Sequence, residues 1–199
     1  MLVFWKEKLV FLAVPKTGTT ALEGALAPRA SIVLRDPPEL KHSAVYRYNR
    51  WLDPFFEKAG GQKMETLAVV RHPVDWLGSW FRYRSREDLI GHPNSTRDMD
   101  FDDFVNDFCR GTQPPHAAVG SQAKFLLKPD GSLGVDHLFQ YEQQDKLVAF
   151  LEDRLGGTIE MKRLNVSPAM ELEISPKMEE KFRRKRPEEF DVWEMGARS

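Results

Sequence analysis

A short polar turn near the N-terminus has the residue types of a phosphate-binding site. It comprises Lys16, Thr17, Gly18, Thr19 and Thr20. The almost unbroken apolar run at residues 9–14 is typical of a strand buried on both faces, and helix-forming residues follow from Ala21. N–H groups at a helix N-terminus attract anions, Gly18 permits close approach, and Lys16 adds a charge. The stretch predicts a phosphate-binding turn, with an ordinary turn of the same composition as the alternative.

The order of residues in this turn differs from that of the Walker phosphate loop, G-x-x-x-x-G-K-[ST]. In the Walker loop the Lys follows the last Gly, and a hydroxyl that binds Mg²⁺ comes next. Here Lys16 precedes Gly18 and no Gly begins the loop. The five histidines also lack the close spacings of a zinc site. We therefore expect an anion site that works without a bound metal.

A second group of polar residues follows the next apolar run, METLAVV at residues 64–70. Arg71 comes directly after this predicted strand, and Ser79 lies in the helix predicted for residues 74–83. An Arg side chain presents a planar fork of donors to phosphate oxygens, and a Ser hydroxyl can add one more. Because ligands of parallel sheets bind beyond the carboxyl ends of the strands, the two motifs predict two neighbouring phosphate sites.

Together these motifs resemble those of the sulfotransferases that use 3′-phosphoadenosine 5′-phosphosulfate (PAPS). PKTGTT at residues 15–20 is similar to the family's 5′-phosphosulfate loop, and Arg71 with Ser79 is similar to its 3′-phosphate motif. The stretch at residues 138–156, with its Tyr-Glu pair, also looks like the family. Residues 101–108, 119–122 and 164–168 resemble the bacterial and carbohydrate-type branch. His72, where the family often has an acidic or amide residue, and the short chain depart from the pattern.

The resemblance implies in-line transfer of a sulfuryl group from PAPS to a hydroxyl, less readily an amine, of a carbohydrate or small metabolite. Lys16 is the cation expected to stabilise the leaving phosphate oxygen. His42, after a turn and at a predicted helix start, is the candidate general base, with an exposed helix-start histidine as the alternative. The same phosphate chemistry leaves two other functions open: a nucleotide-dependent small-molecule kinase, and a catalytically silent nucleotide-binding protein.

The elements that must position these residues alternate between strands and helices. Apolar runs predict strands at residues 9–14, 30–34, 64–70 and 135–141. Helical spacing predicts helices at residues 39–58 (split near Pro54), 74–83, 101–108 (capped by Asp100), 147–155 and from Pro176 to before Pro187; residues 121–127 stay undecided between helix and strand. Residues 163–168 are expected to form a loop. This alternation predicts an α/β fold, and the resemblance implies a P-loop NTPase-like, three-layer form with a mostly parallel central sheet.

Composition restricts the remaining choices. A chain of 199 residues with 41% hydrophobic content suits a single domain, residues 1–199. The net charge of −1 gives no reason to expect nucleic acid, and the single Cys109 cannot form an internal disulfide. The apolar N-terminus is interrupted by charges, so we expect neither a membrane span nor a signal peptide. These features predict a cytoplasmic protein. The sequence does not indicate its oligomeric state.

Overall fold

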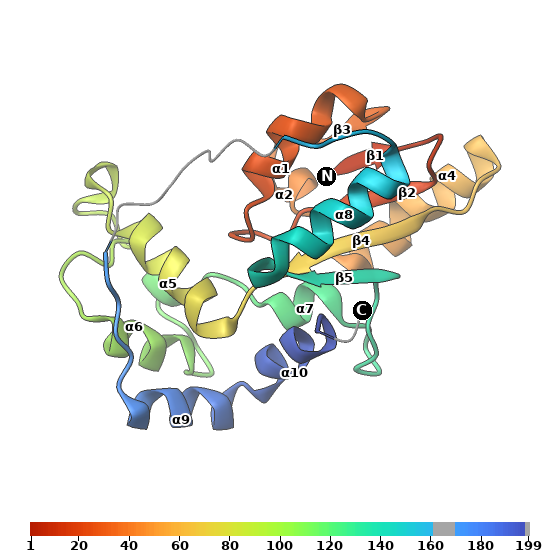
Figure 1. Ribbon diagram of the computed structural model, residues 1–199. Helices are drawn as coiled ribbons and strands as arrows, with labels where there is room; N and C mark the ends of the chain where they lie inside the picture. The colour runs from red at the N-terminus through yellow and green to blue at the C-terminus, as the bar shows by residue number, and fades with distance from the viewer. Residues whose placement is uncertain (161–169, 198–199) are drawn as a thin grey trace.

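The apolar runs of the sequence form one five-stranded sheet in the order β3-β1-β2-β4-β5 (Figure 1). The computed structural model describes residues 1–160 and 170–197. The strands are β1 (Leu2–Phe4), β2 (Leu9–Leu12), β3 (Ile32–Val33), β4 (Glu65–Val70) and β5 (His137–Gln140). The four predicted strands are thereby confirmed, and β1 is one that sequence reasoning missed.

The sheet is mixed, so the expectation of a mostly parallel sheet is wrong. Strand β4 pairs in parallel with β2 and β5, whereas β1 pairs antiparallel with β2 and β3. The physical reason is the short connection at residues 5–8, because a parallel pair needs a crossover of a dozen or more residues. The parallel half still brings the carboxyl ends of β2, β4 and β5 to one edge.

Helices cover both faces of this sheet. They are α1 (Thr19–Leu26), α2 (Pro38–Lys41), α3 (Val45–Arg47), α4 (Asp53–Gly60), α5 (Pro73–Arg84), α6 (Phe101–Phe108), α7 (Gln122–Leu126), α8 (Gln144–Leu155), α9 (Pro176–Lys185) and α10 (Pro187–Met195). One face packs against α1 and α8, and the other against α3, α4, α7 and α10. Alternate strand residues supply the two cores: Val10 faces one and Phe11 the other. The α/β class with helices on both faces is thus confirmed.

A third apolar cluster extends the molecule beyond the sheet. It joins α5, α6, α9 and α10, whose ribbons lie beside the sheet (Figure 1). The contacts are made by aromatic side chains such as Phe104 and Phe182, both fully buried. The predicted cap of α6 is confirmed, because the carboxylate of Asp100 accepts a hydrogen bond from the Asp103 N–H at 2.7 Å. This cluster fixes α5, whose first turn follows Arg71.

Several boundaries differ from the sequence expectations. The long helix expected at residues 39–58 is divided into α2, α3, a π-helical turn η2 (Tyr48–Leu52) and α4, with Pro54 in the first turn of α4. Within the undecided stretch 121–127, residues 122–126 form helix α7, and the residue on either side is extended. The helix expected from Pro176 to before Pro187 is confirmed as α9, but it is not the last one, because Pro187 opens α10, where its missing N–H does no harm. The loop expected at residues 163–168 lies outside the described residues.

Candidate functional site

The polar turn after β2 has a strained and firmly held backbone. Lys16 has φ of 66° and Gly18, which precedes α1, has φ of 74°. A side chain at Gly18 would also collide with a neighbour, since an added Cβ would lie 2.8 Å from Cε2 of Tyr141. The indole N–H of Trp76 donates to the Pro15 carbonyl at 2.9 Å and fixes the turn from the side of α5. The left-handed φ of Lys16 costs ~1–2 kcal/mol, which only a well-supported turn sustains.

This turn leaves its backbone donors free. Among the described residues, no protein acceptor takes the N–H groups of residues 17–20, and no side chain caps α1. The Thr17 hydroxyl is buried and donates to the Val14 carbonyl at 2.9 Å, so Thr17 offers a ligand its N–H alone. Thr19 is buried as well, whereas Thr20 is exposed. Free N–H groups at the start of a helix form a binding site for an anion.

Arg71, the first residue after β4, reaches this turn. Its Nη1 donates to the Lys16 carbonyl at 3.5 Å, and its guanidinium lies over the Tyr141 ring, 4.5 Å from the ring centroid. Its Nε is buried and has no partner among the described residues. A buried donor without a partner costs ~1–3 kcal/mol, so Nε is a group that a bound acceptor oxygen would satisfy. The structure thus brings the two sequence motifs together.

The backbone of Arg71 is fixed by a separate polar network. The Gln122 side chain accepts from the Arg71 N–H at 2.9 Å and donates to the Arg71 carbonyl at 2.8 Å. Glu189 of α10 in turn accepts from the Gln122 N–H at 3.1 Å. Burial raises the pKa of the Glu189 carboxyl to about 7, against stabilising hydrogen bonds. Gln122 and Glu189 therefore position Arg71 without facing the site, and sequence reasoning had assigned them no role.

Positive charge accumulates around Lys16. Its Nζ lies 4.2 Å from the centroid of the Tyr83 ring, and the guanidinium of Arg86 lies 4.0 Å from the same centroid. Burial lowers the pKa of Lys16 to about 8, and the positive charge of Arg86 is the next largest cause. Arg71 and Arg82 lower it further. Arg86 pairs with the exposed Asp88 at 3.3 Å, whereas no described carboxylate forms an ion pair with Lys16, Arg71 or Arg82, so the site has an excess of positive charge that an anion would neutralise.

Arg82, Tyr83 and Arg86 were absent from the sequence-based site. The run WFRYRSR at residues 80–86 alternates basic and aromatic residues, and that pattern was the available signal. It was ambiguous, because Arg84 of the same run is buried and donates to the carbonyls of Pro115 and His116 at 2.7 and 2.6 Å. Only the fold separates Arg82 and Arg86, whose charges act on Lys16, from the buried Arg84, which supports the chain.

Ser79 is the predicted site residue that is least connected to the others. It lies buried in α5, and no hydrogen bond joins its side chain to Arg71 or the turn. Its neighbour Gly78 packs close to Leu172, where an added Cβ would lie 3.3 Å from a methyl carbon. Binding by the Ser79 hydroxyl stays a prediction.

His42 is attached to the end of β2. It ends α2 rather than beginning a helix, which corrects the sequence expectation. Its Nδ1 lies 2.7 Å from the Ala13 carbonyl oxygen, three residues before Lys16. A carbonyl can only accept, so Nδ1 carries the proton and the neutral ring keeps its lone pair on Nε2. Burial lowers the pKa of His42 despite this hydrogen bond. Nε2 has no hydrogen-bond partner among the described residues, and a neutral ring with this nitrogen available has the properties of a general base.

Comparison with known proteins adds no family to this description. No family model matches the chain, and neither the curated proteins nor the solved structures searched contain a match. Within residues 1–160 and 170–197, no three His, Cys, Asp or Glu side chains gather to hold a metal ion. None of the helices described is long and apolar enough to cross a membrane. The site itself therefore carries the functional argument.

Proposed function

We propose that this protein is a PAPS-dependent sulfotransferase that transfers a sulfuryl group to a hydroxyl acceptor, a carbohydrate or small metabolite. The observation that carries the proposal is the contact of the Arg71 guanidinium, at the end of β4, with the Lys16 carbonyl in the turn after β2. The proposal includes a P-loop NTPase-like fold, with the phosphate turn between β2 and α1.

Two distinct groups of donors suit a nucleotide that is phosphorylated at both its 5′ and 3′ positions. The free N–H groups of residues 17–20 and the Lys16 ammonium would hold the 5′-phosphosulfate. The Arg71 guanidinium, with its unpartnered Nε, would hold the 3′-phosphate. Arg82 and Arg86 add positive charge around the ligand. An ordinary nucleoside triphosphate has no 3′-phosphate and would leave the Arg71 donors unused.

The reaction balances without a further reagent. The acceptor oxygen forms a bond to sulfur while the bond between sulfur and the bridging oxygen of the 5′-phosphate breaks. The bisphosphorylated nucleotide leaves with the electron pair, and the acceptor proton passes to a base. Lys16 stabilises the charge that grows on the bridging oxygen. His42 accepts the proton at Nε2, the nitrogen that its bond to Ala13 leaves free.

The main competing function is a kinase that uses ATP and Mg²⁺. Walker-type kinases coordinate Mg²⁺ through the hydroxyl that follows the loop Lys. In the Walker loop that Lys comes directly after the last Gly, whereas in this chain Lys16 precedes Gly18 and the residue after Gly18 is Thr19. The loop therefore lacks a Lys at the Walker position, and this order of residues favours the sulfotransferase.

The experiment that tests the proposal separates catalysis by Lys16 from binding. Single-turnover transfer of labelled sulfate from PAPS to a panel of sugars and phenols is measured for the wild type and for Lys16→Ala. We expect the single-turnover rate constant of transfer to fall by on the order of 10²–10³, the scale for loss of one preorganised donor. Calorimetric affinity for 3′-phosphoadenosine 5′-phosphate (PAP) should fall less, because the N–H groups of residues 17–20 remain.

Two results would contradict parts of this proposal. If transfer survives in Lys16→Ala while PAP binding collapses, Lys16 anchors the ligand and the catalytic cation lies elsewhere. If PAP binds but the wild type sulfates no acceptor, the protein is a silent nucleotide-binding protein. Lys16→Arg serves as the charge-preserving control, and we expect poor rescue because a planar guanidinium does not replace a compact ammonium in this turn.

A further inference from the structure

A small hollow lies beside the turn, between the end of β2 and helices α3 and α7. Its volume is about 210 Å³, and its wall includes Pro15, Tyr46, Arg47, Trp76, Lys124 and Phe125. Drug-sized ligands occupy pockets of roughly 300–1,000 Å³, so this hollow suits about one ring. Its aromatic and aliphatic wall favours the flat face of such a ring.

The hollow shares a wall with the proposed donor site. Pro15 lines it and directly precedes Lys16, and Trp76, which also lines it, is the residue that holds the Pro15 carbonyl. A molecule seated here would therefore lie next to the Lys16 turn. This position is the one that an acceptor needs for attack on a group bound at the turn.

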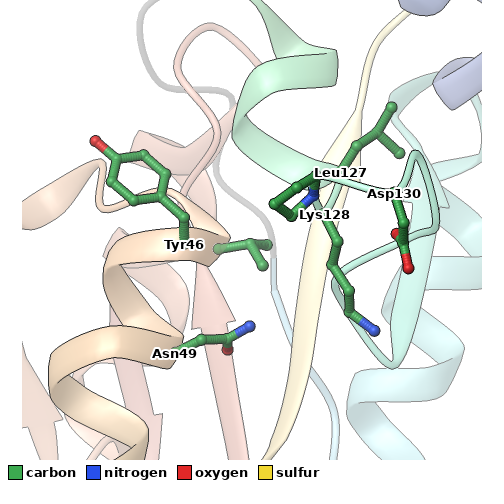
Figure 2. Close-up of a pocket in the computed structure, with 7 residues that line it drawn as sticks. Tyr46, Asn49, Leu127, Lys128 and Asp130 are labelled. Atoms are coloured by element: carbon green, nitrogen blue, oxygen red, sulfur yellow. The ribbon is translucent and has the colours of Figure 1, made fainter.

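A larger hollow, of about 430 Å³, also has Tyr46 in its wall (Figure 2). Tyr46 and Asn49 form one wall, and Leu127, Lys128 and Asp130 form the other (Figure 2). It does not include the Lys16 turn in its wall, and it carries charges of both signs. The smaller hollow is thus the one with a defined relation to the chemistry.

The charges at the smaller hollow are both positive. Arg47 is held in the wall, since its Nε donates to the Tyr46 hydroxyl at 2.8 Å and its Nη1 to the Glu39 carbonyl at 3.5 Å. Lys124 is exposed and approaches from α7, on the opposite side. Neither forms an ion pair with a carboxylate among the described residues. Two unneutralised cations beside an apolar wall are complementary to a ring that carries an anionic group.

Building on the proposed function, we propose that this hollow binds the acceptor and that the acceptor is a hydroxylated ring bearing a carboxylate. The ring lies against Trp76 and Phe125, and Arg47 and Lys124 bind the carboxylate. The hydroxyl is then the group that attacks sulfur, with bond changes as described above. A phenolic acid and a uronic acid share this chemistry, and the experiment distinguishes the two.

The test compares each acid with its neutral amide. Calorimetry on the PAP-saturated full chain measures binding of 4-hydroxyphenylacetate against 4-hydroxyphenylacetamide, and of methyl glucuronide against its uronamide. We expect at least one acid to bind about tenfold or more tightly than its amide, the scale of one charge-assisted hydrogen bond. In the double variant Arg47→Gln, Lys124→Gln that preference should fall to about threefold or less, with PAP affinity unchanged.

The matched control is Arg50→Gln, which removes an exposed arginine of η2 that does not line the hollow. It should leave the preference for the acid intact. If neither acid binds better than its amide, or if the preference persists in the double variant, the proposal is overturned while the donor site stands. If PAP itself fails to bind, the proposed donor site is wrong. The same titrations of acid against amide are then made without nucleotide, and the same preference for the acid tests whether the hollow binds it.

Discussion

Replacing Lys16 by Met should make the free protein more stable while removing its activity. The Lys16 ammonium is half-buried, lies among arginines and has no carboxylate partner among the described residues. Methionine is an unbranched side chain of similar length with the same backbone demand at φ of 66°, and it removes the ammonium charge. In a site that binds an anion, an unpaired cation destabilises the free protein but is needed for activity. Such a site therefore predicts that removing the charge raises stability and abolishes activity.

The size of the gain follows from the pKa of Lys16. A fall from the ordinary 10.5 to about 8 corresponds to ~3 kcal/mol at about 1.4 kcal/mol per pKa unit. Solvent screens a half-buried charge, which reduces this figure to about 1.5 kcal/mol. Loss of the contact with the Tyr83 ring costs about 0.5–1 kcal/mol. The net expectation is ~1 kcal/mol, or a rise in Tm of about 2–4 °C for a chain of this length.

The pH dependence supplies a second check on the same variant. The pKa of Lys16 is lower in the folded state than in the unfolded chain, so the cost is fully present below pH 8. It declines as the folded state loses its proton between pH 8 and 10.5. The advantage of Lys16→Met in urea denaturation should therefore shrink across this window.

The matched control is Lys8→Met. Lys8 also has a positive φ, of 52°, but its side chain is exposed. Its stability should change by less than about 0.5 kcal/mol. A loss of stability in Lys16→Met, or a gain that is the same at pH 7 and pH 10, would refute the account of Lys16 as a desolvated, unneutralised cation.

Three further variants test the surroundings of the turn. Arg71→Ala should weaken PAP binding by about 1.5–3 kcal/mol, measured by calorimetry, and should cost little for adenosine 5′-phosphate; equal losses would make Arg71 structural. Gly18→Ala should cost ~1–2 kcal/mol of stability. Most of that loss should remain when Tyr141→Leu is added, because the left-handed φ of 74° is unchanged. Full recovery in the double variant would assign the cost to the contact with the Tyr141 ring instead. Because the pKa of Glu189 is raised in the folded state, the wild type should lose stability as pH rises from 4.5 to 7. Glu189→Gln should flatten this dependence of the free energy of unfolding on pH. An unchanged dependence would show that Glu189 does not titrate there.

The parallel half of the fold was predictable from local patterns. The run at residues 9–14 and the run at residues 64–70 are continuous and apolar, which suits strands buried on both faces, and both became strands. The strand β1 was missed because Leu2–Phe4 is only three residues long and looks like part of a longer apolar N-terminus. Its antiparallel pairing depends on the tight turn at residues 5–8, a feature with no Gly or Pro to announce it.

The candidate site was predictable only where its residues follow strands. Arg71 was found because it comes directly after β4, and Lys16 because it lies in the turn that follows β2; the parallel pairing of β2 and β4 places both positions at one edge. Gln122 lies 51 residues after its partner Arg71, and Glu189 lies 67 residues after its partner Gln122. No local sequence pattern connects residues so far apart. The orientation of the Thr17 hydroxyl is likewise a product of the folded turn.

The most direct measurement of the central claim is the choice of nucleotide. Thermal shift and calorimetry compare PAP with ATP plus Mg²⁺ on the wild type and on Arg71→Ala. The proposed two-phosphate site predicts that PAP stabilises the wild type and that ATP with Mg²⁺ does so far less, with the preference lost in Arg71→Ala. Stabilisation by ATP and Mg²⁺ alone would contradict the proposed sulfotransferase.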